Sequence, residues 1–243
     1  MKSILARGGV EFLAVFLGIG LSLWIDDYQD EVNIKKEIKS SLNALTIELT
    51  DNIETLNYII KRIDYNISFT ERLLETKNLF KQDMNSKDSI WNANIIPLGN
   101  KLYLNAYNNM LSSGLIYKVD DKNLLYDIQT IYEYNITLFE WWVDYETKFI
   151  EHIDKYIFKN LALNKTGANW ELNWENKITI EGIQTIEFQN IIIGNRANRE
   201  ILKDIAEQLI VSKNNLLKGI KSFNNSIWIN VRLFSKKYLV VGS

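Results

Sequence analysis

Cysteine is absent from this 243-residue chain, and proline and histidine occur once each. Without cysteine the chain can form no disulfide, no cysteine-ligated metal site and no thiolate nucleophile. A single histidine, His152, cannot build a zinc site alone, because such sites need several ligands. We therefore expect the segment Glu151-His152-x-Asp154 to be an exposed helix turn.

Sequence motifs of nucleotide binding and of hydrolysis are missing as well. There is no phosphate-binding Walker loop, no Gly-x-Gly-x-x-Gly and no Gly-x-Ser-x-Gly. Acidic pairs such as Glu48 and Asp51 are expected on solvated helix faces, and they indicate no acid–base chemistry without a pocket. We therefore expect a protein that is not an enzyme, with no catalytic residue, no metal ligand and no cofactor.

The charge balance and the scarcity of helix-breaking residues indicate the class of protein and of fold. The 28 Lys and Arg residues nearly balance the 30 Asp and Glu residues, and no basic stripe stands out. This balance argues against a nucleic-acid-binding protein. Only eleven glycines accompany the single proline, and 47% of the residues are hydrophobic. The composition predicts an all-α fold, an antiparallel helical bundle.

The one long charge-free stretch lies near the N-terminus, at residues 12–25. As a helix it covers ~21 Å, and with residues 8–11 it covers ~27 Å, against a hydrocarbon core of ~30 Å. This predicts a transmembrane helix over residues 10–25, after a short cytoplasmic tail at 1–9. A cleaved signal peptide is disfavoured, because no small-x-small pair precedes a cleavage point. A buried core helix stays open as the alternative.

Basic residues predict the orientation of this helix. Lys2 and Arg7 precede it, and the next basic residue is Lys35. By the positive-inside rule the N-terminus is cytoplasmic and the body extracytoplasmic, in a single-pass protein of the bacterial inner membrane. We assign four residues to the far membrane interface: Trp24, Asp26, Asp27 and Tyr28.

Small residues line one side of the same helix. Ala14, Gly18 and Ser22 are each four residues apart, a spacing that lets two helices approach closely in lipid. Glu11 lies on the same side and completes the predicted membrane-helix interface. Its carboxylate has two interpretations: it faces a partner and carries protons, or it reaches the cytoplasmic boundary and pairs with Arg7.

The N-terminal residues resemble a known family. Its members carry Gly-Glu, an aliphatic run, Gly, and then Ala-Leu-x-Ile-Asn-Asn-Trp-Asn-Glu before a helical body. The matching residues here are Glu11, Gly18, Ser22-Leu23, Ile25-Asp26-Asp27-Tyr28 and Asp30, followed loosely by Ala106-Tyr107, Leu111, Ser113-Gly114-Leu115 and 124–132. The chain departs from the pattern at Val10, Ser22 and 26–28. The family is an uncharacterised bacterial group, and the resemblance implies a single-span membrane protein and no catalytic residues.

The predicted body, residues 26–225, starts with one long helix. Neither glycine nor proline occurs between Gly20 and Pro97, and apolar residues recur by threes and fours. A strict seven-residue repeat fails at Glu48. An eleven-residue repeat relates four residues: Ile34, Leu45, Leu56 and Ile67. We therefore predict a helix from about 27 to 80 that continues the membrane helix and supercoils little.

Further elements follow from turn residues. Residues 83–100 predict a loop, and a short helix over 102–113 should end at Gly114, a left-handed cap. A helix from 120 or 121 to about 161 precedes a loop at 164–185, with room for a small β-hairpin near 169–188. A last helix over 185–223, interrupted at Gly194, leaves a C-terminal tail at 226–243 without an assigned role.

Aromatic residues crowd the helix over 120–161. Further aromatic residues lie in the loop that follows. Those that the core does not require are candidates to bind a ligand or a partner: Tyr134 and Trp141 on the helix and Trp174 in the loop. Plain core packing is the alternative for the whole group, since aromatic residues dominate ordinary cores.

These features together predict a membrane-anchored, non-enzymatic helical protein that acts as an interaction or assembly subunit. Its expected partners are the membrane and either copies of itself or another membrane protein, and not nucleic acid. The alternative is an extracytoplasmic bundle that senses a ligand and signals through a partner membrane subunit.

Overall fold

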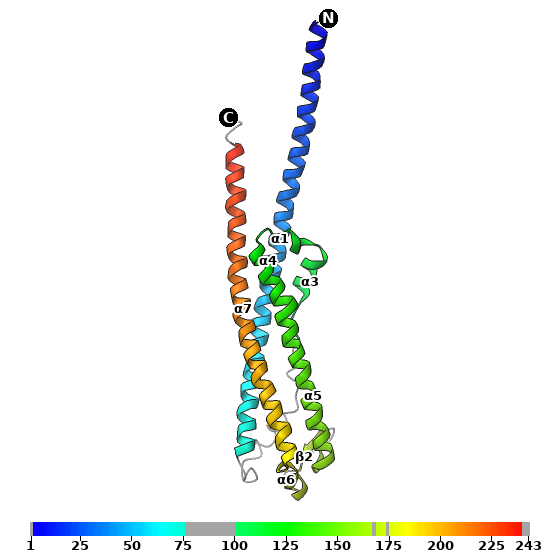
Figure 1. The fold of residues 1–243 in the computed structure, drawn as a ribbon, viewed down its shortest axis with the longest axis vertical. Coiled ribbons are helices and arrows are strands. Elements are labelled where there is room, and N and C mark those ends of the chain that lie inside the picture. Colours follow the sequence, from blue (N-terminus) through cyan, green and yellow to red (C-terminus); the bar gives the residue numbers. More distant parts are fainter. Residues whose placement is uncertain (1, 76–100, 167–168, 174, 240–243) are drawn as a thin grey trace. The chain divides into compact units, whose positions relative to one another are not determined.

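The computed structural model describes residues 2–75, 101–166, 169–173 and 175–239 (Figure 1). In residues 2–11, 14 and 227–239, among others, the backbone alone is described. The described chain is mostly helical, which confirms the all-α prediction. Its elements are α1 (Lys2–Glu75), α3 (Asn105–Ser112), the 3-10 helix η2 (Leu115–Lys118), α4 (Lys122–Gln129), the π-helix η3 (Thr130–Asn135), α5 (Ile136–Asn160), β1 (Leu163–Thr166), β2 (Asn169–Leu172), α6 (Lys177–Ile183) and α7 (Ile186–Leu239).

Several predicted boundaries agree with these elements. The long first helix is present as α1, and Gly114 follows α3 with a φ of 71°, the left-handed conformation expected of a cap. α7 corrects the predicted last helix, because it continues through Gly194 and extends to Leu239. The predicted loop at 83–100 lies outside the described residues.

The hairpin expected near 169–188 is not found there. Residues 177–183 form α6 instead, and the side chain of Asn176 caps it by accepting a hydrogen bond from the N–H of Ile178. Strands β1 and β2 pair antiparallel, with Leu163 opposite Leu172, so of these two strands β2 alone falls within the expected range.

The chain divides into two compact units. The first comprises residues 1–47, 105–125 and 218–243, and the second comprises residues 48–104 and 126–217. The N-terminal part of α1 belongs to the first unit, and η3 and α5 belong to the second. In it α1 and α7 run antiparallel, since Lys203 donates to Asp64 over 2.6 Å and Arg196 lies 2.8 Å from Glu71.

The core of α1 follows a seven-residue repeat, which corrects the eleven-residue repeat predicted from the sequence. Of the four residues expected eleven apart, Ile34 and Ile67 are only half-buried. Glu48, expected on a solvated face, is buried as well and lies outside this repeat. The other buried residues alternate in steps of four and three: Ile38, Leu42, Leu45, Leu49, Asn52, Leu56, Ile59, Ile63, Asn66 and Thr70. Polar side chains at Asn52, Asn66 and Thr70 hide this repeat from a count of apolar residues.

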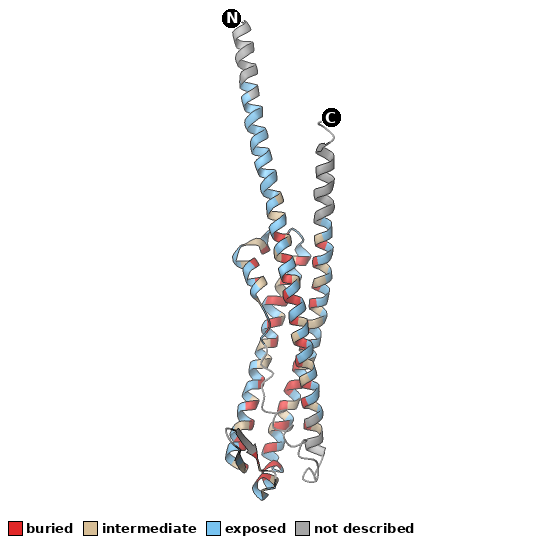
Figure 2. Cartoon of the chain, turned by 180° about the vertical axis from the view of Figure 1, so that it is seen from behind, coloured by how far each residue is buried: buried red, intermediate tan, exposed pale blue. Residues whose placement is uncertain are grey.

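Helix α7 has the same repeat. Its buried residues include Phe188, Ile192, Asn195, Arg199, Leu202, Ala206, Leu209, Lys213, Leu216, Ile220 and Phe223, again in steps of four and three. Such spacing is typical of helices that pack side by side in a coiled coil. Figure 2 shows buried residues recurring at short intervals along α1, α5 and α7. The described helices therefore form a bundle.

The π-helix η3 inserts one residue into this spacing between α4 and α5. Ile128 is buried before it, Ile131 and Tyr132 are buried within it, and Ile136 is buried after it. Two consecutive core residues, Ile131 and Tyr132, mark the insertion, because an α-helix would have buried only one of them.

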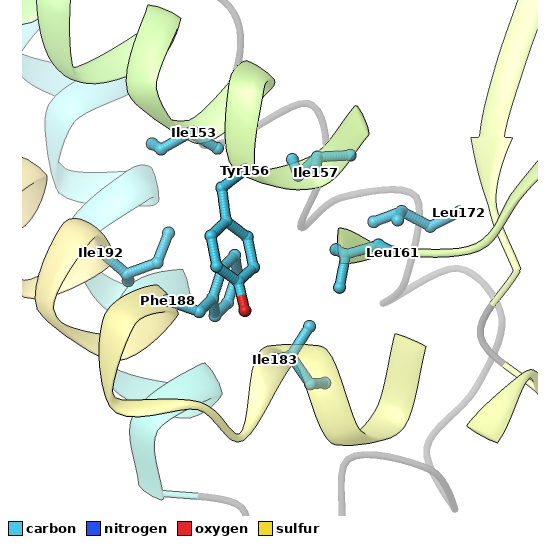
Figure 3. Close-up of a cluster of buried hydrophobic side chains, with 8 residues drawn as sticks. All are labelled: Ile153, Tyr156, Ile157, Leu161, Leu172, Ile183, Phe188 and Ile192. Atoms are coloured by element: carbon cyan, nitrogen blue, oxygen red, sulfur yellow. The ribbon is translucent and has the colours of Figure 1, made fainter. Parts of the chain in front are cut away.

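One hydrophobic cluster closes the end of the second unit (Figure 3). It joins α5, β2, α6 and α7 through Ile153, Tyr156, Ile157, Leu161, Leu172, Ile183, Phe188 and Ile192. The hydroxyl of Tyr156 donates to the carbonyl oxygen of Gly182 over 2.7 Å and lies 2.6 Å from Oγ1 of Thr185. This buried hydroxyl is therefore satisfied.

The prediction of a single-pass membrane protein is wrong. Within the described residues, no helix combines the length and the apolar character that crossing a bilayer requires. The charge-free run at 12–25 reaches only ~21 Å as a helix, and Asp26 and Asp27 follow at once. The localisation in the bacterial inner membrane, with a cytoplasmic N-terminus and an extracytoplasmic body, is withdrawn with it.

Candidate functional site

The N-terminal part of α1 exposes the largest run of apolar side chains among the described residues. Their exposed fractions range from 45% at Ile25 to 70% at Phe12 (Figure 2). The run comprises Phe12, Leu13, Val15, Phe16, Leu17, Ile19, Leu21, Leu23, Trp24 and Ile25. We call residues 12–25 the apolar run. Exposed apolar surface of this extent marks an interaction site, because soluble monomers rarely leave it uncovered.

Two glycines leave free space on opposite sides of the apolar run. A Cβ atom added at Gly18 or at Gly20 would meet no other atom within 4 Å. Ser22 is exposed on the same side as Gly18, so this side offers a partner helix a close approach. The side chains of Glu11 and Ala14, predicted on that side, lie outside the described residues.

The four residues assigned to an interface are exposed on α1. The ring of Trp24 stacks on that of Tyr28, with centroids 6.1 Å apart. Asp26 and Asp27 are exposed and directly follow the apolar run. The polar boundary of the run is therefore acidic.

A second exposed surface lies on η3 and α5. Tyr134 is 66% exposed and Trp141 is 57% exposed, so neither of these predicted partner-binding aromatics belongs to the core. Trp141 stacks on Tyr145 at 5.7 Å, and Trp142 stands edge-on to Tyr145 at 5.8 Å. Trp174, the third predicted aromatic, lies outside the described residues. The structure thus brings Tyr134 and Trp141 to one side of a helix.

Two hollows accompany these helices. One, of about 200 Å³, is lined by Tyr145, Lys148, Phe149 and His152, and Lys148 holds its Nζ 5.7 Å from the Tyr145 ring centre. The other, of about 220 Å³, is lined by residues of α4, η3 and α7: Asp127, Thr130, Ile131, Asn135, Ser212 and Asn215. Both are smaller than the ~300 Å³ at which small-molecule sites begin.

Sequence reasoning missed a buried ion pair in the second unit. Arg199 on α7 donates from Nε to Oε1 of Glu146 on α5 over 2.8 Å, and the two side chains are 1% and 0% exposed. Burial lowers the pKa of Arg199, because desolvation disfavours its charge, and Glu146 opposes that shift. Their 53-residue separation in sequence left no signal of this pairing.

A buried lysine lies farther along α7. Lys213 is fully buried, and among the described residues its Nζ has no hydrogen-bond partner. The Nζ lies 5.3 Å from the centre of the Tyr132 ring. Burial lowers the pKa of Lys213 to about 8, and the charge of Glu48 acts in the opposite direction.

These buried polar groups lie apart from both hollows. Arg199, Glu146 and Lys213 are absent from the lining of either one. Within the described part of the chain no group of three or more potential ligands could hold a metal ion.

Comparison of the chain with protein-family models, with curated proteins and with solved structures finds no match. The family resemblance of the N-terminal residues thus stays a prediction.

Proposed function

We propose that this chain is a non-enzymatic interaction or assembly subunit that docks through the apolar run of α1. The observation that carries this proposal is the exposure of all its large apolar side chains between Phe12 and Ile25. Covering one such side chain contributes roughly 1.5–3 kcal/mol. Because these side chains are 45–70% exposed, covering ten of them contributes roughly 9–18 kcal/mol, which is of the size of the ~4–15 kcal/mol lost in translational and rotational freedom on association.

The partner is a set of helices from further copies of this chain. At 100° per residue Phe12 and Leu21 lie on opposite sides of α1, so one neighbouring helix cannot cover both. A bundle of more than two helices covers such a segment on every side. Gly18 and Ser22 supply the side at which two backbones come closest.

Two glycine substitutions test the proposal. Gly18→Leu places a bulky side chain on the small-residue side, and we expect it to lower the oligomeric mass of the full chain. Gly20→Leu is the matched comparison: Gly20 is equally open but lies 200° away around the helix at 100° per residue, opposite the side of closest approach, so it should lower the mass less. Light scattering coupled to size exclusion measures the mass, and circular dichroism verifies the helix content.

The proposal fails if the unmodified chain is a monomer at every concentration measured. It also fails if Gly18→Leu and Gly20→Leu assemble alike. We do not extend it to a ligand-sensing function, because the two hollows on α5 and α7 are too small for an ordinary small-molecule site.

A further inference from the structure

The exposed side of η3 and α5 repeats the spacing of the bundle core. Six exposed residues follow one another in steps of four and three: Tyr134, Leu138, Trp141, Tyr145, Lys148 and His152. We call these six residues the outer seam. Their spacing is the one with which a helix contacts a second helix in a coiled coil. The six residues are not the ones that α5 buries in its own bundle, such as Phe139 and Ile150. Helix α5 therefore has one seam for its own bundle and another that faces solvent.

The hollow on this seam has the geometry of a coiled-coil hole. Its lining residues, Tyr145, Lys148, Phe149 and His152, stand at positions i, i+3, i+4 and i+7 of one helix. Four residues of a facing helix form the hole that receives each side-chain knob in such packing. At about 200 Å³ the hollow is below the size of small-molecule sites and accepts a single side chain.

Carboxylates follow one edge of the outer seam. At 100° per residue Glu133, Glu140, Asp144 and Glu151 all fall within a narrow sector beside Trp141. Residues that flank a coiled-coil seam set the choice of partner through their charge. An acidic flank selects a partner helix with basic residues at its own flank.

We propose that the outer seam binds an amphipathic helix of another protein, apolar at its heptad positions and basic along its flank. The seam is separate from the apolar run of α1, so this inference goes beyond the assembly function proposed above. A second copy of α5 fits less well. Parallel pairing of two copies opposes Lys148 to itself, and antiparallel pairing opposes the acidic edge to itself.

Two synthetic three-heptad peptides test the inference with the full-length chain. Both carry leucine at the core heptad positions, and one carries lysine and the other glutamate at the flanking positions. Fluorescence anisotropy should show binding of the lysine peptide and not of the glutamate peptide. Affinity for the lysine peptide should fall as salt is added, because the flanking charges are exposed.

Seam variants locate the binding site. Trp141→Ala should weaken binding about thirtyfold, as the loss of a central aromatic anchor does. Tyr58→Ala is the control, since Tyr58 is 54% exposed on α1 and away from the seam. The double variant Asp144→Asn/Glu151→Gln should weaken binding and flatten its salt dependence, whereas Asp51→Asn/Glu54→Gln on α1 should do neither. Thermal unfolding by circular dichroism verifies that each variant folds.

Three results would overturn the inference. Equal binding of the two peptides would show that the acidic edge does not select a basic partner. Binding that survives Trp141→Ala would place the peptide elsewhere, for instance at the acidic boundary of the apolar run. Self-association of the chain that Trp141→Ala abolishes would identify a second copy as the occupant. The assembly proposal is judged separately, because Gly18→Leu changes α1 and leaves the outer seam intact.

Discussion

The guanidinium Nε of Arg199 and the carboxylate Oε1 of Glu146 are 2.8 Å apart, in a part of the bundle from which solvent is excluded. Removing two charges from water costs several kcal/mol for each ion, and the pair offsets this loss only while both partners are present. The pair therefore contributes little net stability, but replacing either residue alone leaves the other as an unpaired buried charge.

Breaking this pair should destabilise the chain strongly. We expect Glu146→Ala to lower the free energy of unfolding by about 3–5 kcal/mol, because Arg199 keeps its buried charge. Glu200→Ala is the control: it removes an exposed partner of Arg196 and should change stability by less than about 1 kcal/mol. Urea unfolding followed by circular dichroism gives both values. Equal effects of the two substitutions would contradict this account of the buried charge.

The stability of the chain should depend on alkaline pH through Lys213. Its pKa falls from 10.5 to about 8 on burial, so between these values the unfolded chain binds more protons than the folded one. Stability therefore rises as the pH increases from about 8 toward 10.5, by at most about 3 kcal/mol. Lys213→Met should remove this contribution. Urea unfolding at several pH values measures it, and parallel curves for the two proteins would refute it.

Asn52 should resist replacement by a larger apolar residue even though it occupies a core position. Its Nδ2 donates to the carbonyl oxygen of Tyr103 over 2.9 Å, and its Oδ1 accepts from the N–H of Tyr103 over 2.7 Å. Asn52→Leu leaves both backbone groups without this partner, and we expect a loss of about 1–3 kcal/mol in chemical denaturation. Asn57→Leu, at an exposed residue bonded only within α1, should be nearly neutral. A stabilising Asn52→Leu would show that apolar burial outweighs the amide contact.

Three helical glycines should respond differently to alanine. At Gly219 the added Cβ meets Leu124 Cδ1 at 3.5 Å, an ordinary contact, so Gly219→Ala should stabilise by about 0.5–1 kcal/mol. At Gly182 it overlaps Leu161 Cδ2 and lies 3.0 Å from the carbonyl oxygen of Asn160, so Gly182→Ala should destabilise by about 1–3 kcal/mol. Gly194→Ala, 2.9 Å from Phe149 Cε1, should fall between them. Thermal denaturation gives the order, and any other order would contradict the packing seen at these residues.

The sequence predicted the long helices and the cap at Gly114, because helix breakers and apolar spacing are local signals. It predicted the wrong repeat in α1, since the polar residues Asn52, Asn66 and Thr70 occupy core positions, and apolar spacing does not reveal them. It also predicted a loop at 164–185 with room for a hairpin near 169–188, where the structure has the helix α6 over Lys177–Ile183. There a buried Thr179 holds the helix by donating to the carbonyl oxygen of Ala162 over 3.3 Å, a contact 17 residues away in sequence.

The sequence predicted residues of the candidate site only where the apolar pattern of a single helix shows which side chains are exposed. Tyr134 and Trp141 were identified because the core stripe of α5 did not need them. The hollow beside Lys148 and His152 was missed, because its formation depends on the side-chain conformations of neighbouring residues on the helix. The acid–base properties of Lys213 were missed as well, since they depend on which helices enclose it.

The π-helix at Thr130–Asn135 has a consequence for how this chain can change its length. A deletion inside an ordinary α-helix turns everything downstream by about 100° and would swing the partner-facing side of α5 into the bundle. Here a one-residue deletion would instead let the backbone return to regular i→i−4 bonding while the downstream turns keep their orientation. Related chains that are one residue shorter in this segment would thus preserve both sides of the helix.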